Sequence, residues 1–182
     1  MRIATLGPIG SNHALIARRY GDRHAPASTE ILLFGDFFAA FEALMAGEVD
    51  SVLQCTAHFI HADCVGRYMH RAFPVDLFVA GSRALALLAR SEVAKPESVG
   101  FQPATRYYTD LAAFDARVEV PTIVAAAEGL LAGRFDAAIC ARDVLDQHAV
   151  ALRLIEDLGP ALDVWVLYGK HPLPDTSPLV LS

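Results

Sequence analysis

Short apolar runs alternate with amphipathic stretches along nearly the whole chain. Runs of four to eight apolar residues are typical of buried strands, whereas apolar positions repeating every three or four residues indicate helices. The predicted strands are 2–6, 31–34, 50–54, 75–80, 84–89, 98–101, 117–120, 137–140, 152–155 and 163–168. The predicted helices are 12–20, 36–46, 105–114, 122–132 and 141–148. This alternation indicates βαβ units, an α/β fold and mostly parallel sheets.

Helix-end signals support several of these boundaries. Ser11 or Asn12 can cap the first helix, because a short polar side chain accepts a hydrogen bond from a backbone N–H of the first turn. Gly47 and Gly133 follow two helices at the position where a left-handed residue often ends them.

Composition and charge narrow the possible partners. The 182 residues suit one domain or two lobes, and 54% of them are hydrophobic. No apolar run is long enough to span a membrane, and the first residues lack the features of a secretory signal, so we expect a cytoplasmic protein. A net charge of −6 argues against nucleic acid. Three cysteines, an odd number, indicate reduced thiols.

Two turns of small residues connect a predicted strand to a predicted helix. These turns are Gly7–Asn12 and Gln102–Thr105. Backbone N–H groups at helix starts bind anions, and ligands of open α/β sheets lie beyond the carboxyl ends of strands. We therefore expect both turns to hold a small anionic ligand. The plainer alternative is a tight turn with Ser11 as a cap. The Gly7–Asn12 turn matches neither a dinucleotide fingerprint nor a phosphate loop, because its glycine spacing differs and it lacks the lysine.

The segment Thr5–Ser11 resembles the opening motif of prephenate dehydratases. Matching segments are Gly47–Asp50, Pro103–Ala104, Ala125–Ala127 and Asp136–Ile139. The resemblance covers residues 1 to 170. It implies a two-lobed type 2 periplasmic-binding-protein-like fold with an interlobe cleft that holds the ligand. Lobe 1 would be residues 1–80, completed by 163–182, and lobe 2 residues 81–162.

The chain departs from that family at two places. Ala57-His58-Phe59 stands where dehydratases carry Glu-Asn-Ser, and Asp163–Tyr168 lacks their Thr-Arg-Phe segment. The chain is more similar to the non-aromatising prephenate decarboxylase branch of bacilysin biosynthesis, at Thr5–Pro8, Ala57, Tyr68-Met69 and Trp165–Lys170. The resemblance implies a cofactor-free lyase that decarboxylates prephenate or a related cyclohexadienyl or aromatic keto acid. Dehydration is a second possible activity.

Such a decarboxylase must hold a carboxylate, release CO2 and protonate a carbon. Histidine suits proton transfer near neutral pH, and His58 is the candidate proton donor. Its plainer role is a cap or a core partner. The candidate ligand-binding residues lie around the two turns, after the third strand and in the last strand: Gly10, Ser11, Asn12, His13, Thr56, Ala57, His61, Gln102, Ala104, Thr105 and Trp165.

Two alternatives to a lyase stay open. The first is a non-catalytic binding protein for a small carboxylate. The second is a metal enzyme, because Cys55, His58, His61 and Cys64 recur every three residues and are all zinc ligands. On one helix Cys55 and Cys64 would face opposite sides, so these ligands converge only in an irregular segment. We expect neither a metal nor a cofactor, and a homodimer remains possible.

Overall fold

A computed structural model describes residues 1–180, which form two compact α/β units. Unit 1 consists of Met1–Ala80 and the segment from Leu162 onward, and unit 2 is Gly81–Ala161. The chain therefore passes between the units twice. These boundaries differ by one residue from the predicted lobes. Leu181 and Ser182, at the end of the predicted first lobe, lie outside the described residues.

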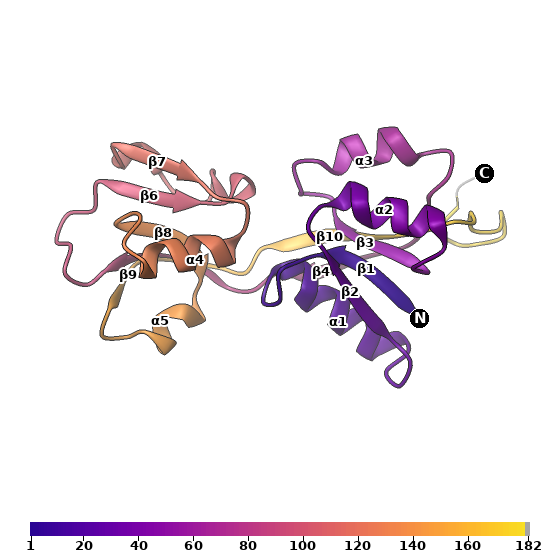
Figure 1. The fold of residues 1–182 in the computed structure, drawn as a ribbon, viewed down its shortest axis with the longest axis horizontal. Helices are drawn as coiled ribbons and strands as arrows, with labels where there is room; N and C mark the ends of the chain where they lie inside the picture. The colour runs from indigo at the N-terminus through magenta and orange to yellow at the C-terminus, as the bar shows by residue number, and fades with distance from the viewer. Residues whose placement is uncertain (181–182) are drawn as a thin grey trace. The chain divides into compact units, whose positions relative to one another are not determined.

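Unit 1 is built on a five-stranded sheet with the strand order β2-β1-β3-β10-β4 (Figure 1). β1 is parallel to β2 and β3, and β10 is antiparallel to β3. The strands are β1 (Arg2–Leu6), β2 (Glu30–Phe34), β3 (Ser51–Cys55), β4 (Phe73–Gly81) and β10 (Leu162–Gly169). The helices are α1 (Asn12–His24), α2 (Phe37–Ala46) and α3 (His61–Tyr68).

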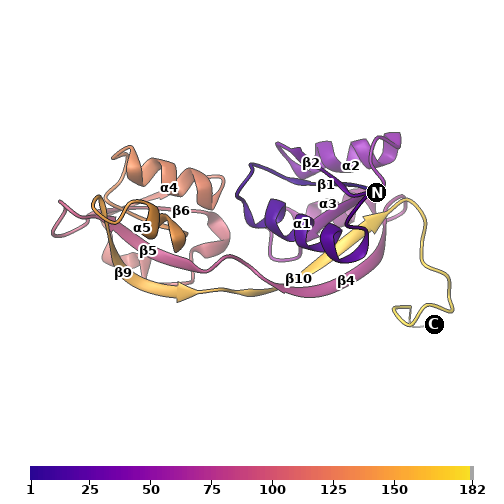
Figure 2. The ribbon, with the colours of Figure 1, turned by 90° about the horizontal axis from the view of Figure 1, so that it is seen from below.

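The two faces of the unit 1 sheet carry separate cores. α2 and α3 cover one face, which β1 and β3 line with Ala4 and Val52. α1 covers the other face, where Ile3 and Leu53 pack (Figures 1 and 2). Neighbouring residues of a strand point to opposite faces, so fully buried strands such as β3 supply both cores.

Unit 2 contains a second five-stranded sheet in the order β7-β6-β8-β5-β9. β6 is parallel to β7 and β8, and β5 is antiparallel to β8 and β9. The strands are β5 (Leu85–Arg90), β6 (Ser98–Phe101), β7 (Ala116–Glu119), β8 (Ala137–Ala141) and β9 (Leu152–Gly159). The helices are α4 (Ile123–Leu131) and α5 (Asp143–Gln147), and two short 3-10 helices, η1 (Pro103–Thr105) and η2 (Leu111–Ala113), follow β6.

Each sheet is mixed, which corrects the expectation of mostly parallel sheets. The chain enters unit 2 through β5 and leaves it through β9, so these two strands run in opposite directions and pair with each other. The return through β10 likewise places an antiparallel strand beside β3. Because the chain passes between the units twice, each sheet contains antiparallel strand pairs beside its parallel βαβ strands.

The helix predicted for residues 105–114 is not formed, and η1 and η2 stand in its place. The run Thr105-Arg-Tyr-Tyr-Thr109 is rich in β-branched and aromatic residues of modest helix propensity. The Thr105 hydroxyl also donates to the Gln102 carbonyl at 2.8 Å, so it favours a local turn over a continued helix.

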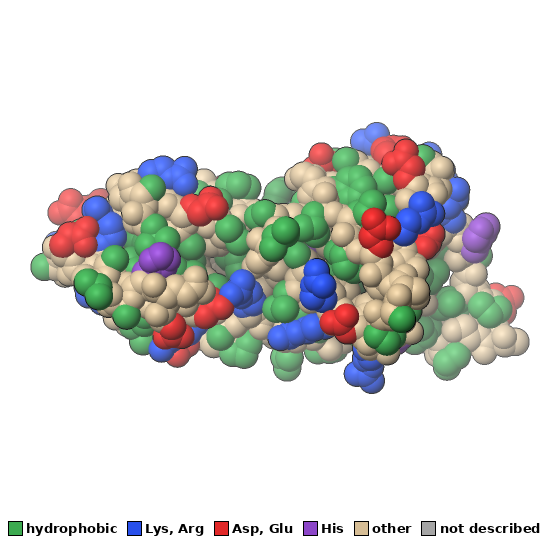
Figure 3. Space-filling view, turned by 60° about the horizontal axis from the view of Figure 1, so that its bottom comes forward, with side chains coloured by type: hydrophobic (Ala, Val, Ile, Leu, Met, Phe, Trp, Pro, Cys, Tyr) green, Lys and Arg blue, Asp and Glu red, His purple; other side chains and the backbone are tan. Residues whose placement is uncertain are grey.

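The helix ends indicated by the sequence are confirmed. The Ser11 hydroxyl accepts from the Ala14 N–H, and Gly47 and Gly133 have φ of +79° and +69°. Among residues 1–180, no helix has the length and apolar character needed to cross a membrane. On the face drawn in Figure 3, basic and acidic side chains are interspersed, so this part of the described surface offers nucleic acid no continuous basic area.

Candidate functional site

The Gly7–Asn12 turn connects β1 to α1 at the carboxyl edge of the unit 1 sheet. The Ser11 N–H donates to the Pro8 carbonyl at 3.1 Å, and Gly10 has a φ of +88°, which favours glycine. The Ser11 hydroxyl is buried and donates to the Leu6 carbonyl while it caps α1. Ser11 therefore shapes the turn, and the first residues of α1 form the surface next to it.

His13, in the first turn of α1, lies in a cage of aromatic rings. Its ring centroid is 5.1 Å from Phe37, 5.0 Å from Trp165 and 5.5 Å from His58. Its Nε2 accepts the Cys55 N–H at 3.4 Å, so the proton of the neutral ring is on Nδ1. Burial, and to a lesser degree the neighbouring His58, lowers the pKa of His13 to about 3.

His58 lies on the turn that follows β3, opposite His13. Its ring is 5.0 Å from Phe37 and stacks on Phe59 at 4.6 Å. Its Nδ1 accepts the Ile60 N–H at 3.4 Å, which leaves the proton of the neutral ring on Nε2. Burial, followed by the effect of His61, lowers the pKa of His58 to about 4. Both rings are therefore neutral at pH 7.

His61 starts α3 and is engaged by the last strand. Its Nε2 lies 2.8 Å from the Tyr168 hydroxyl, and burial lowers the pKa of His61. Burial raises the pKa of Tyr168 to about 12. Tyr168 thus holds His61 in place, a role that was not predicted from the sequence. Side chains alternate between the two faces of a strand, so Tyr168 and Trp165, three residues apart, face opposite sides of the sheet. This alternation is the sequence signal that could have placed Tyr168 on the α3 side, where His61 lies.

Trp165 lies behind His13 in the core of unit 1. Only 1% of its surface is exposed, and it pairs with Cys55 on the neighbouring strand. Among the described residues its indole N–H has no hydrogen-bond acceptor. In this arrangement Trp165 supports the His13 ring, and its predicted contact with a ligand stays a prediction.

Thr56 and Ala57 are exposed beside His58. The Thr56 N–H donates to the Val164 carbonyl at 3.0 Å, which fixes the turn after β3 against β10. The contact between His13 and His58 brings the start of α1 and the turn after β3 together. The predicted site residues that lie in unit 1 are Gly10, Ser11, Asn12, His13, Thr56, Ala57, His58, His61 and Trp165.

The other predicted half, Gln102 to Thr105, lies after β6 in unit 2. The Gln102 side chain accepts the Ala104 N–H at 2.9 Å, and Thr105 is buried. This half was predicted because a helix start binds anions. The helix is not formed there, and η1, with only three residues, lacks the aligned peptide dipoles of a full helix start. That the two turns face each other across a cleft stays a prediction.

The metal alternative is disfavoured by the side-chain positions. Cys55 packs in the α1 core and Cys64 in the α2 and α3 core, on opposite faces of the unit 1 sheet. Nowhere in residues 1–180 do three or more histidine, cysteine, aspartate or glutamate side chains come together as a possible metal site.

Comparison with known proteins places the fold. No family model matches the chain, and no curated protein matches it. Prephenate dehydratase from Arthrobacter aurescens, solved in complex with L-Phe, is similar in structure, with a TM-score of 0.67 and 20% identity. The match covers 97% of this chain and 63% of that one, so the chain spans less than two thirds of the dehydratase.

Two further structures have the same fold. The periplasmic aliphatic sulphonate binding protein SsuA from Escherichia coli has a TM-score of 0.52 and 15% identity, over 93% of this chain and 64% of that one. GqqA, described as a novel type of quorum quenching acylase, has a TM-score of 0.53 and 18% identity, over 98% and 68%. The chain therefore has the type 2 periplasmic-binding-protein-like fold.

Proposed function

We propose that this chain binds a small organic acid beside His13 and His58 and acts on it as a cofactor-free lyase. The observation that carries the proposal is the packing of two neutral histidines against the start of α1, at the carboxyl edge of β1 and β3. Helix starts favour anions, and neutral imidazoles offer N–H donors without a competing counterion.

The substrate class that we propose is supported by the fold and by the aromatic ring that lies beside His58. A cyclohexadienyl or aromatic keto acid such as prephenate combines carboxylates with a flat six-membered ring. Phe59, which is 64% exposed and stacks on His58 at 4.6 Å, offers a ring face for such a body. The prephenate dehydratase of similar structure supports this class.

The reaction we favour is non-aromatising decarboxylation. The bond between the ring and its carboxylate breaks, CO2 leaves, and the electron pair moves through the diene to a ring carbon, which takes up a proton. His58 donates that proton once the bound anion has raised its pKa. The similarity to the prephenate decarboxylase branch, at Ala57 and in the Trp165–Lys170 segment, supports this choice over dehydration.

A non-catalytic carboxylate-binding protein is the second candidate. The low pKa of His58, about 4, favours this binding role, because an imidazole that is neutral at pH 7 is a poor proton donor. It becomes a good donor only when a neighbouring negative charge raises its pKa. SsuA, with the same fold, is a binding protein.

The deciding experiment mixes purified protein with prephenate and follows the diene absorbance, CO2 release and products. Decarboxylation predicts release of CO2 with loss or shift of the diene and no aromatic product. Formation of phenylpyruvate would mean dehydration and would overturn the reaction we favour. Absence of turnover with a rise in melting temperature would indicate the binding protein.

Carboxylate affinity is expected to rise as the pH falls from 8 to 5. A bound anion raises the pKa of His58 from about 4, so the complex takes up a proton that the free protein does not hold. Each unit of that rise increases the affinity by up to about tenfold, and the gain is complete only below the free pKa of about 4. Calorimetric titration with a strong keto acid, which stays ionised throughout, measures the effect. His58→Gln should bind with little pH dependence, and an equally steep profile in that variant would contradict the assignment.

A further inference from the structure

A carboxyl group that the proposed reaction does not use lies beside the turn after β3. Asp163 is the second residue of β10, and the carbonyl of the next residue, Val164, accepts the Thr56 N–H at 3.0 Å. His58 follows Thr56 by two residues in that turn. This backbone contact therefore places Asp163 at the end of β3 that leads to His58.

The Asp163 side chain is on the same face of the sheet as His13. Side chains alternate along a strand, so Asp163 faces the same side as Trp165, which packs on the α1 side with its ring 5.0 Å from that of His13. Cys55 packs on this side too, and its N–H donates to His13. Burial, followed by the effect of Asp163, raises the pKa of the Cys55 thiol to about 11. Asp163 and His13 are therefore both neighbours of Cys55.

The carboxyl group of Asp163 lacks a donor. The residue is partly buried, and burial raises its pKa with no hydrogen bond or positive charge within residues 1–180 to offset the effect. A carboxylate that loses water without gaining a donor destabilises the folded state. Asp163 is thus unfavourable in the free protein and becomes favourable only with a donor from outside the chain.

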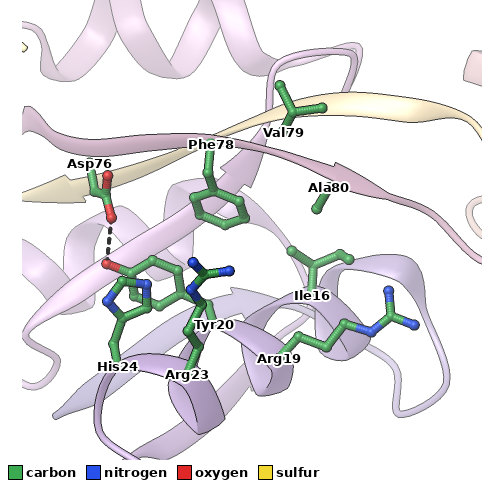
Figure 4. Close-up of a pocket in the computed structure, with 9 residues that line it drawn as sticks. All are labelled: Ile16, Arg19, Tyr20, Arg23, His24, Asp76, Phe78, Val79 and Ala80. Carbon is green, nitrogen blue, oxygen red and sulfur yellow. Dashed lines mark hydrogen bonds between the residues drawn. The ribbon is translucent and has the colours of Figure 1, made fainter.

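Asp76, on the neighbouring strand β4, shows the arrangement that Asp163 lacks. It lies in the wall of a pocket of about 360 Å³ between α1 and β4 (Figure 4). One of its oxygens accepts from the Tyr20 hydroxyl and the other from the Leu77 N–H, each at 2.8 Å. The residues that line the pocket are Ile16, Arg19, Tyr20, Arg23, His24, Asp76, Phe78, Val79 and Ala80. The chain therefore satisfies one partly buried carboxylate of this sheet and leaves the other open.

The kind of ligand group that suits Asp163 follows from its charge. An ionised carboxylate only accepts hydrogen bonds, and it disfavours a second carboxylate beside it. The carboxylate of a bound acid is favoured at the start of α1, so the group beside Asp163 must be a different one, a donor. A keto acid of the class proposed above has no amino group, which leaves a hydroxyl group as the donor.

We infer that Asp163 accepts a hydrogen bond from a hydroxyl group of the acid that binds beside His13 and His58. The site is thereby specific for acids that carry a hydroxyl group as well as a carboxylate. This inference rests on the proposed function and narrows its substrate class.

The test compares 4-hydroxyphenylpyruvate with phenylpyruvate, which lacks only the hydroxyl group, by calorimetric titration of the whole chain at pH 7. The hydroxylated acid should bind at least about tenfold more tightly, because it gains a hydrogen bond to a charged group. Asp163→Ala should bring the two affinities to within about twofold of each other, through weaker binding of the hydroxylated acid. Asp163→Asn keeps an oxygen acceptor and should retain part of the difference.

Two controls separate recognition from damage to the fold. Asp175→Ala removes the same charge from an exposed position after β10 and should leave the preference unchanged. Asp163→Asn should melt at the wild-type temperature or above it, because the substitution removes a partly buried charge and breaks no hydrogen bond.

The outcomes distinguish this inference from the proposed function. Equal affinity of the wild-type chain for the two keto acids, or an unchanged preference in Asp163→Ala, would overturn the inference and leave the proposed function in place. Tighter binding of L-phenylalanine than of 4-hydroxyphenylpyruvate would also overturn it, because Asp163 would then accept from an ammonium group. If neither keto acid binds, the proposed function fails and this inference fails with it.

Discussion

His58→Gln is expected to lower prephenate turnover by at least about a hundredfold while it leaves binding of the acid in place at pH 7. Glutamine keeps an N–H donor near the position of Nε2, but it cannot deliver a proton to carbon. At neutral pH the free His58 ring is itself uncharged, so the two side chains hold the bound anion by similar hydrogen bonds. The loss should therefore appear in kcat and not in KM.

Two controls separate this effect from damage to the fold. His70→Ala removes an exposed histidine from the turn after α3 and should keep the wild-type rate. His58→Ala should lose both turnover and part of the binding, because the ring also packs on Phe37 and Phe59. If His58→Gln turns over prephenate at the wild-type rate, His58 is not the proton donor and the assignment of the reaction to this ring is wrong.

Gly100→Ala is expected to destabilise unit 2 by about 3 kcal/mol, the largest effect on stability that we expect from a single added methyl group. A Cβ at Gly100 would lie 2.3 Å from Cζ of Phe135, and one at Gly129 would lie equally close to the same atom. The Phe135 ring, which is 3% exposed, thus lies between β6 and α4. Gly100 on the strand and Gly129 on the helix leave room for it because neither has a side chain. Neither glycine has a positive φ, so the requirement is one of space.

Urea unfolding, with hydrogen exchange of the β6 and α4 amides to localise the effect, measures this loss. Gly66→Ala in α3 is the matched control, because an added Cβ there meets nothing within 4 Å. Its stability should rise by about 0.5–1 kcal/mol from helix propensity. Phe135→Leu should recover part of the stability of Gly100→Ala, and this coupling identifies the ring as the obstacle. Unchanged stability of Gly100→Ala would mean that Phe135 packs elsewhere.

The part of the candidate site that lies in unit 1 could be predicted from the local sequence pattern. A serine that stands just before a predicted helix is a candidate capping residue, and Ser11 does cap α1. His13 and His58 each follow a buried strand, and β1 and β3 are adjacent parallel strands, so the segments that follow them meet at one edge. Their low pKa values come from burial, and the packing of Phe37 on both rings is not evident from the order of residues in the chain.

The pocket of unit 1 between α1 and β4 had no sequence signal of its own. Arg19 and Arg23 look like ordinary surface residues of a helix, and Asp76 and Phe78 like parts of an edge strand. Their meeting depends on β10 placing β4 at the edge of the sheet, far along the chain from α1. No local pattern carries that information.

Local preferences were sufficient for the α/β class, for most strand and helix positions and for the helix caps, because neighbouring residues decide them. Long-range pairing decided the rest. The antiparallel placement of β5, β9 and β10 follows from the two passages of the chain between units, and turn formation after Gln102 replaced a predicted helix. The charge states of His13 and His58 belong to the same category, since a pKa follows from what surrounds a ring and not from its place in the chain.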